Sequence, residues 1–215
     1  MQASTSPPAT VVLVENPGFT ALLEERMHAA SAAARAKVDA KIRDRYERDA
    51  AVMIIDMSGF SRITQEEGIV HFLALIHRMQ GLVLPIIRAA VGGHVVKTEA
   101  DNVYAMFDSV QAAIDTAIAL QEACRAAFDG KPANDAVRLS IGIAWGRLLD
   151  LDGNEYYGDP VNLASKLGED LASAGDIYVT ADAAESTTLP DGWHREPKRE
   201  RISNIDIEFL ALVCD

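Results

Sequence analysis

The sequence has 215 residues, 49% of them hydrophobic, which is enough to bury the core of one domain with an additional segment. Its formal net charge of −12 argues against a surface that binds the phosphate backbone of nucleic acids, so we expect no nucleic-acid partner. The two cysteines, Cys124 and Cys214, provide neither a disulfide framework nor the spacing of a metal-ligand motif.

Neither a membrane-spanning helix nor a signal peptide is predicted. No apolar run approaches the ~20 residues that a bilayer-spanning helix needs, and no basic segment followed by an apolar stretch stands near residue 1. Together with the cysteine content, these features favour a reduced, cytoplasmic setting.

Residues 1–49 are predicted to form an extension that precedes the main domain at residues 50–215. Residues 10–14 are a β-branched run typical of a short edge strand, and Asn16 and Pro17 then provide the cap and the first turn of a helix. Apolar residues recur every three or four positions in the rest of the extension, which predicts one long amphipathic helix. This helix could pack on its own domain or on a second copy, or it could remain a solvated connector.

From residue 51 onward, strands and helices alternate in the order β-α-β-β-α-β. The expected elements are a strand at 51–56, a helix at 61–90 that Gly68 could interrupt, strands at 94–98 and 103–107, a helix at 110–128 and a strand at 137–145. This order is that of the ferredoxin-like core, so the predicted fold class is α+β.

The remainder of the chain is predicted to add a hairpin, a helix and C-terminal strands to this core. The hairpin at 147–154 turns at Asp152-Gly153, and the helix at 161–172 begins with Asp159 as its cap and Pro160 in its first turn. Strands are expected at 176–180 and 205–213, whereas residues 186–204 are polar and expected to be irregular.

Asp56 and Asp101 each stand where a predicted strand ends. The crossover connection places the first two strands parallel in one sheet, so the end of the first strand and the turn after the second meet at the same edge. Two carboxylates at such an edge are suited to hold divalent cations against phosphates. The alternative is that both aspartates only terminate their strands, because Asp is common in turns.

Further residues could complete such a site. Lys97 stands four residues before Asp101 on a predicted strand and therefore shares its face. Glu155 precedes a turn, and Asn162 and Lys166 are spaced i, i+4 and share one face of a helix. Each of these residues by itself is usually just a solvated surface residue, but together they form a non-random pattern.

With these residues in place, the sequence resembles the catalytic domain of the class III nucleotidyl cyclases, the adenylate and guanylate cyclases. The resemblance runs from about residue 51 to residue 213 and rests on three motifs in the same order as in the family: IDMSGFS at 55–61, VKTEAD at 96–101 and YGDPVNLASKL at 157–167. It implies a head-to-tail homodimer in which one copy supplies the metal-binding aspartates and the other supplies the residues that stabilise the transition state.

By this resemblance, Asp56, Asp101 and the backbone carbonyl of Met57 would hold two Mg²⁺ or Mn²⁺ ions per site. The ions would lower the pKa of the ribose 3′-hydroxyl of ATP and clamp the α-phosphate as pyrophosphate leaves. Backbone N–H groups and a hydroxyl at the start of a helix would bind the outer phosphates. The residues that carry these groups are Gly59, Phe60 and Ser61.

The same resemblance assigns the remaining candidates. Lys97 and Glu155 match the positions that read the purine, and a lysine with an acidic residue there is typical of members that select adenine. Asn162 matches the residue that orients the ribose. Lys166 stands where the family carries its transition-state arginine, so this position keeps the charge but lacks the planar fork that binds phosphate oxygens.

Other departures from the family accompany Lys166. Ala100 replaces the glycine that usually precedes the second metal aspartate, which would strain the turn if that position requires a positive φ. Glu155 is one methylene longer than the usual aspartate. The phosphate-binding lysine that the family carries near its last strands has only candidates here: Lys198, Arg199 and Arg201.

The expected function is therefore that of a slow adenylate cyclase that works on ATP as a homodimer. The retained metal aspartates favour this hypothesis. The lysine at position 166 favours an alternative, a regulatory module that binds nucleotide and metal without useful turnover. A third hypothesis, a diguanylate cyclase with the same core, is disfavoured because the Gly-Gly-Asp/Glu-Glu-Phe turn of those enzymes is absent.

Overall fold

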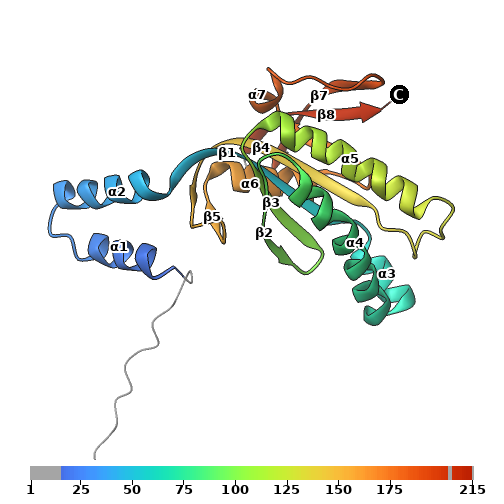
Figure 1. Cartoon of the computed structure of the whole chain (residues 1–215), viewed down its shortest axis with the longest axis horizontal. Helices are drawn as coiled ribbons and strands as arrows, with labels where there is room; N and C mark the ends of the chain where they lie inside the picture. Colours follow the sequence, from blue (N-terminus) through green and yellow to red (C-terminus); the bar gives the residue numbers. More distant parts are fainter. Residues whose placement is uncertain (1–15, 203–204, 215) are drawn as a thin grey trace, which may run out of the picture. The chain divides into compact units, whose positions relative to one another are not determined.

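The computed structural model describes residues 16–202 and 205–214. The chain divides into two compact units, Met1–Glu47 and Arg48–Asp215 (Figure 1). Helices form the described part of the first unit, and a sheet with helices on its faces forms the second.

The first unit contains two helices, where the sequence predicted one long helix. α1 (Pro17–Met27) begins at the predicted cap, because the Asn16 side chain accepts a hydrogen bond from the N–H of Phe19 at 3.0 Å. α2 (Ala32–Tyr46) starts anew at Ser31, whose hydroxyl caps its first turn. The sequence offers no Pro or Gly at this break, and the capping serine was the signal that the prediction overlooked.

Contacts between α1 and α2 explain why the chain folds back. Two ion pairs join the helices, Arg26 with Asp39 at 2.5 Å and Lys41 with Glu25 at 2.7 Å. The rings of Phe19 and Tyr46 also meet edge to face, with centroids 5.4 Å apart. A continuous helix could not form any of these contacts. The strand predicted at 10–14 lies outside the described residues.

The second unit is built from a sheet and the helices that connect its strands. Its strands are β1 (Glu47–Met57), β2 (Gly93–Glu99), β3 (Asn102–Phe107), β4 (Leu139–Asp150), β5 (Tyr156–Tyr157), β6 (Ile177–Thr180), β7 (Trp193–Ile202) and β8 (Ile205–Cys214). Its helices are α3 (Phe60–Glu67), α4 (Ile69–Ala89), α5 (Val110–Phe128), α6 (Asp159–Ser165), the π-helix η1 (Lys166–Leu171) and α7 (Ala181–Ala184).

The strand order confirms the predicted fold class. The sheet runs β2-β3-β1-β4-β6-β8-β7, with β5 paired to β4. β3 is antiparallel to both β1 and β2, so β1 and β2 run parallel on either side of it, as the split β-α-β arrangement requires. The helical segment between β1 and β2 breaks at Gly68, as predicted, where a φ of 87° separates α3 from α4.

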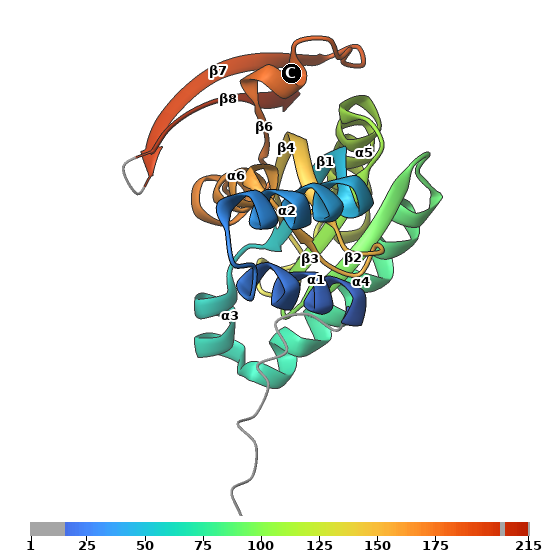
Figure 2. The ribbon, with the colours of Figure 1, turned by 90° about the vertical axis from the view of Figure 1, so that its left-hand side faces the viewer.

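Side chains alternate between two cores along β1. Met53 and Ile55 face the core formed with α4 and α5, whereas Val52 and Ile54 face a smaller core that includes Ala164 of α6. Figure 2 shows α4 and α5 on one side of the central strands and α6 on the other. Because alternate residues of a strand point to opposite faces, Asp56 shares the face of Ile54, toward α6 and η1.

Helix α4 departs from the expectation that no segment is long and apolar enough to span a membrane. By length and composition alone, Ile69–Ala89 could cross a bilayer. In this structure its inner face is a core face, since Phe72, Leu75 and Met79 are almost fully buried beside the sheet. A helix that packs against the core of a domain can therefore be as long and as apolar as one that crosses a bilayer.

The segment predicted to be irregular, residues 186–204, contains a strand. β7 pairs antiparallel with β8 from Trp193 to Ile202. β7 lies at the end of the sheet and has a pairing neighbour on one side only, which is where charged strands are common. This charged composition is why the strand was not predicted. Charged edge strands of this kind lack the alternating apolar pattern by which a strand is predicted.

The turn between β2 and β3 holds a strained alanine. Ala100 adopts a φ of 52°, in the left-handed region that residues other than glycine rarely enter. The sequence indicated this possibility, because a glycine is expected at this position. The turn that carries Asp101 is therefore formed at a conformational cost.

We expect Ala100→Gly to stabilise the protein. Glycine removes the cost of about 1–2 kcal/mol that alanine incurs in the left-handed region, and its greater freedom in the unfolded chain offsets about 0.5–1 kcal/mol of that gain. Urea unfolding should show a net increase in the free energy of unfolding of about 0.5–1 kcal/mol. As a control, Ala126→Gly on the exposed face of α5 should lower it by about 1 kcal/mol. Equal losses from both changes would contradict the strain.

Candidate active site

The structure brings the ends of β1 and β2 to one edge of the sheet. Ile55 on β1 pairs with Val103 on β3, so the turn that precedes β3 lies beside the residues that follow Ile55. Asp56 is the penultimate residue of β1, and Asp101 lies in that turn. The predicted juxtaposition of the two aspartates therefore follows from the pairing of β1 with β3.

The electrostatics of this edge reflect the two neighbouring acids. Burial, and then the negative charge of Asp101, raise the pKa of Asp56 to about 6. The charge of Glu169 on η1 acts in the same direction, whereas a hydrogen bond from the backbone of Met57 lowers the Asp56 pKa. Burial also raises the pKa of Asp101. Two half-buried groups thus carry like charges that no cationic side chain neutralises in the described contacts.

This donor set fits a divalent cation that is shared with a phosphate. Within residues 16–202 and 205–214, no three His, Cys, Asp or Glu side chains gather into a group that could hold a metal alone. Mg²⁺ is commonly held by only one or two carboxylates together with substrate phosphates and water. The pair formed by Asp56 and Asp101 matches that requirement, and a cation would relieve its repulsion.

The segment after β1 forms a helix start beside the aspartates. Gly59 precedes α3 with a φ of 104°, which a glycine adopts without strain. The N–H of Ser58 is occupied by the carbonyl of Arg138 at 3.0 Å. The N–H groups of Phe60 and Ser61 stand in the first turn of α3, where backbone donors have no acceptor within the helix. They are therefore available to an anion.

Lys97 and Glu155 meet in the folded chain, although they are far apart in the sequence. The Lys97 ammonium on β2 donates to the Glu155 carboxylate at 3.1 Å, and both side chains are partly buried. The same ammonium lies 5.2 Å from the centre of the Tyr104 ring. A shift in the β2–β3 register between Val95 and Lys97 marks a bulge, which is a common device for aiming a side chain beside a site.

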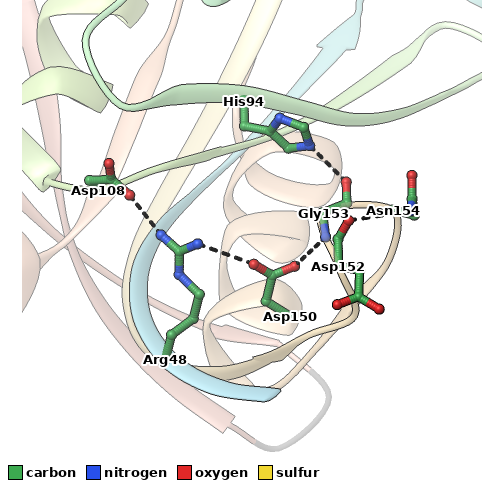
Figure 3. Close-up of polar contacts among 7 residues, drawn as sticks. All are labelled: Arg48, His94, Asp108, Asp150, Asp152, Gly153 and Asn154. Carbon is green, nitrogen blue, oxygen red and sulfur yellow. Dashed lines mark hydrogen bonds and ion pairs between the residues drawn. The ribbon is translucent and has the colours of Figure 1, made fainter. Parts of the chain in front are cut away.

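The hairpin that carries Glu155 is fastened to the sheet by a group of polar contacts (Figure 3). Arg48 donates to Asp108 at 2.6 Å and to Asp150 at 3.1 Å. The other oxygen of Asp150 accepts the N–H of Gly153 at 2.8 Å, and a ring nitrogen of His94 lies 2.7 Å from the Gly153 carbonyl. The hairpin turns at Asp152-Gly153 as predicted, with both residues at positive φ.

We expect Asp150, rather than Asp108, to hold this hairpin. Asp150 is 13% exposed and has two partners, so Asp150→Ala leaves the Gly153 N–H and one Arg48 nitrogen unpaired, at a cost of about 1–3 kcal/mol. Asp108 is 69% exposed, and its single ion pair should contribute less than about 1 kcal/mol. Urea unfolding of Asp150→Ala and Asp108→Ala would compare them. A loss from Asp108→Ala as large as that from Asp150→Ala would contradict this assignment.

Asn162 and Lys166 lie one helical turn apart, as their spacing predicts. The Lys166 N–H donates to the carbonyls of Asn162 and Leu163, and Lys166 begins the π-helix η1. The helix starts one residue earlier than predicted, because Gly158 rather than Asp159 is the capping position, and Asp159 and Pro160 occupy the first turn. In the described residues, no hydrogen bond or ion pair joins Asn162 or Lys166 to the two aspartates.

The candidate phosphate-binding cations lie on β7 and have partners or neighbours there. Lys198 pairs with Glu196 at 2.9 Å, and Arg199 lies 3.6 Å from Glu208. Arg201 is the penultimate residue of β7, and residues 203–204 lie outside the described part of the chain. Within residues 16–202 and 205–214, none of these three side chains forms an ion pair with Asp56 or Asp101.

Glu169 is a residue of this region that the sequence analysis missed. Its carboxylate accepts hydrogen bonds from the Asn102 side chain at 2.9 Å and from the Tyr104 hydroxyl at 3.2 Å. It also accepts from Ser165. The i, i+4 spacing of Ser165 and Glu169 is visible in the sequence, but their position beside the β2–β3 turn depends on the π-helix.

No family model matches the chain. A Rhizobium meliloti protein that is provisionally named an adenylate cyclase is 29% identical over 133 residues, which cover 62% of this chain. The chain spans only 22% of the length of that relative. The similarity therefore concerns one part of a longer protein.

Solved structures match the fold over most of the chain. An adenylate/guanylate cyclase/hydrolase from Silicibacter pomeroyi is 30% identical, with a TM-score of 0.65 over 79% of this chain and 98% of that one. The guanylyl cyclase Cya2 is 16% identical, with a TM-score of 0.64 over 77% of this chain and 92% of that one. At this lower identity, the second match concerns the fold alone.

Proposed function

We propose that this chain, which belongs to the class III adenylate/guanylate cyclase family, converts ATP to cyclic AMP and pyrophosphate as a homodimer. The observation that carries the proposal is the pair of half-buried carboxylates, Asp56 and Asp101, that repel one another at one edge of the sheet. Such a pair destabilises the protein unless a cation is bound, so its presence is best explained by a functional site. The name of the Rhizobium meliloti relative supports adenylate over guanylate cyclase activity.

In this proposal, Asp56, Asp101 and the carbonyl of Met57 hold two Mg²⁺ or Mn²⁺ ions against the substrate phosphates. When bound, the ions would lower the pKa of the ribose 3′-hydroxyl and offset the charge that develops on the α-phosphate. The backbone N–H groups beside Gly59, with the Ser61 hydroxyl, bind the outer phosphates at the start of α3.

Base selection is assigned to the ion pair between Lys97 and Glu155. Lys97 donates to N1 of adenine, and Glu155 accepts from its exocyclic amino group. Because the two side chains already lie 3.1 Å apart, little ordering is needed before the base binds. The contacts of Arg48 and Asp150 support this arrangement by holding the Glu155 hairpin.

Asn162 and Lys166 are proposed to act on the substrate that is bound to the aspartates of a second copy. The absence of a described bond between them and Asp56 or Asp101 of the same chain favours a site shared by two copies. Asn162 orients the ribose, and Lys166 offsets charge on the α-phosphate. We place this activity in the cytoplasm, because both cysteines are free thiols, as expected in a reducing compartment.

Lys166 also favours a second candidate function, a regulatory module that binds nucleotide without useful turnover. Its ammonium gives fewer fixed contacts to phosphate oxygens than a guanidinium would. Both candidate functions predict nucleotide binding, but only the cyclase predicts turnover of the nucleotide. The purified protein should therefore be tested with Mn²⁺ and ATP or GTP, with the cyclic product quantified.

We expect product from ATP, with kcat/KM for ATP at least about tenfold above that for GTP. Guanine would leave Lys97 and Glu155 imperfectly paired, and each buried hydrogen bond left unmade costs about 1–3 kcal/mol. The comparison needs initial rates at matched Mn²⁺ concentrations. Equal or faster turnover of GTP would refute the assigned base selection, and nucleotide binding without any product would favour the regulatory module.

The shared site is tested by mixing two inactive variants. Asp56→Ala and Asn162→Ala should each abolish activity as homodimers, because every site then lacks one essential group. A heterodimer of the two has one site with both groups intact, so mixing should restore up to about half of the activity per dimer. Mass spectrometry of differently tagged chains would verify exchange. Verified heterodimers that remain inactive would exclude this shared-site arrangement.

The chemistry at position 166 is tested with two substitutions. Lys166→Arg should raise kcat by about tenfold or more and leave the KM for ATP nearly unchanged, because one well-placed donor contributes on the order of 10²–10³ in rate. Lys166→Ala should lower kcat. If neither variant changes kcat in an active preparation, Lys166 has no part in the reaction.

A further inference from the structure

We propose that Glu169 is a positioning residue for Asp101, because its carboxylate fastens the β2–β3 turn to η1 through Asn102 and Tyr104. This inference rests on the proposed function, since it takes Asp101 to be a cation ligand. It adds to that function a residue from a different element of the chain. Glu169 also connects Asp101 with the helical segment of Asn162 and Lys166, which the proposed function assigns to the other site of the dimer.

The contacts of Glu169 with the turn lie on the C-terminal side of Asp101. One carboxylate oxygen accepts from the side chain of Asn102, the next residue in the chain, at 2.9 Å. The same oxygen accepts from the hydroxyl of Tyr104, further along β3, at 3.2 Å. Hydrogen bonds to a charged acceptor are the stronger kind, so together they restrain the first residues of β3.

The turn requires such a restraint because it is strained. Ala100, immediately before Asp101, has a φ of 52°, and an alanine left to itself would leave this conformation. The residues at the tip of the turn, Glu99 and Ala100, are exposed, so packing contributes little to holding them. The hydrogen bonds from Asn102 and Tyr104 to Glu169 restrain the chain on the C-terminal side of Asp101, where packing contributes little.

Glu169 can act as a tether because η1 is itself closely packed on the sheet. A Cβ atom on Gly168 would lie 2.8 Å from the carbonyl of Ile54, and one on Gly142 would lie 2.4 Å from the backbone nitrogen of Gly168. Only glycines permit this approach of η1 to β1 and β4. Ser165 donates to the second carboxylate oxygen of Glu169 and restrains its rotamer.

The tether also joins two functional parts of one chain. η1 continues α6, so Glu169 belongs to the same helical segment as Asn162 and Lys166. In a dimer with shared sites, those two residues serve one site, whereas the Asp101 of the same chain serves the other. Glu169 therefore links the cation turn of one site to the helix that acts at the second site.

A purely electrostatic role is the alternative. The charge of Glu169 acts on Asp56 and would attract a cation without positioning anything. Glutamine distinguishes the two roles, because its amide oxygen can accept from Asn102 and Tyr104 and its amide nitrogen can donate to Ser165. Glu169→Gln therefore keeps the tether and removes the charge, whereas Asn102→Ala keeps the charge and removes one arm of the tether.

The experiment measures the Mn²⁺ concentration at which a fluorescent ATP analogue is half-maximally bound, because the carboxylate pair is expected to share its cation with phosphates. Positioning predicts that Glu169→Ala and Asn102→Ala weaken binding by about tenfold or more, the usual effect of removing an outer-sphere partner. Glu169→Gln should stay within about threefold of the unaltered chain. Asp170→Asn is the matched control, because it removes the same charge from the next residue of η1, whose side chain has no hydrogen bond or ion pair within the described residues, and this variant should bind normally. Circular dichroism would verify that each variant folds.

Three outcomes separate the possibilities. If Glu169→Gln binds as weakly as Glu169→Ala while Asn102→Ala binds normally, the charge alone matters and positioning is wrong. If all variants bind like the unaltered chain, the positioning inference is wrong and the proposed function stands. If Mn²⁺ promotes binding of the ATP analogue no better in the unaltered chain than in Asp56→Ala, the inference and the proposed cation site are both wrong.

The dimer adds a second readout that a general loss of stability would not give. In the complemented heterodimer, the Asn162→Ala chain supplies the aspartates and the Asp56→Ala chain supplies the helix residues. Adding Glu169→Ala to the former should raise the Mn²⁺ concentration for half-maximal activity by about tenfold. Adding it to the latter should leave that concentration unchanged. Equal increases from both placements would overturn the inference.

Discussion

Two half-buried carboxylates, Asp56 and Asp101, repel one another at one edge of the sheet. Burial, and then the charge of Asp101, raise the pKa of Asp56, and the fold tolerates this because β1 and β3 are held by the pairing of the sheet and by the core beneath it. A stable fold can tolerate two like charges that lie close together, and such pairs are common at sites where a bound ligand neutralises them.

Other features of the second unit serve the same edge. Ala100 is held at a strained positive φ immediately before Asp101, and the Glu169 carboxylate of η1 accepts a hydrogen bond from Asn102 immediately after it. On the neighbouring hairpin, Arg48 and Asp150 keep Glu155 beside Lys97. Each of these contacts joins residues from different elements that are far apart in the sequence.

The sequence by itself determined the order of elements and most candidate residues. Apolar periodicity located β1, α5 and the two strands around Asp101, because these elements are buried on at least one face and the pattern follows directly from burial. The crossover rule then implied that Asp56 and Asp101 would meet at one edge. Where burial was weak the prediction was wrong, as for the charged edge strand β7 and for the single long helix that is α1 and α2.

Only the tertiary structure decided how the candidate residues are supported. The ion pair of Lys97 with Glu155 joins residues 58 positions apart, and the tether from Glu169 to Asn102 spans 67. Local sequence patterns carry no information about such pairs. The pairs depend on a bulge in β2 and on the π-helical turn of η1, each of which shifts the position of the following residues by one. Chemistry-bearing residue types are therefore visible in this sequence, whereas the contacts that hold them in place arise only when the sheet and its helices are assembled.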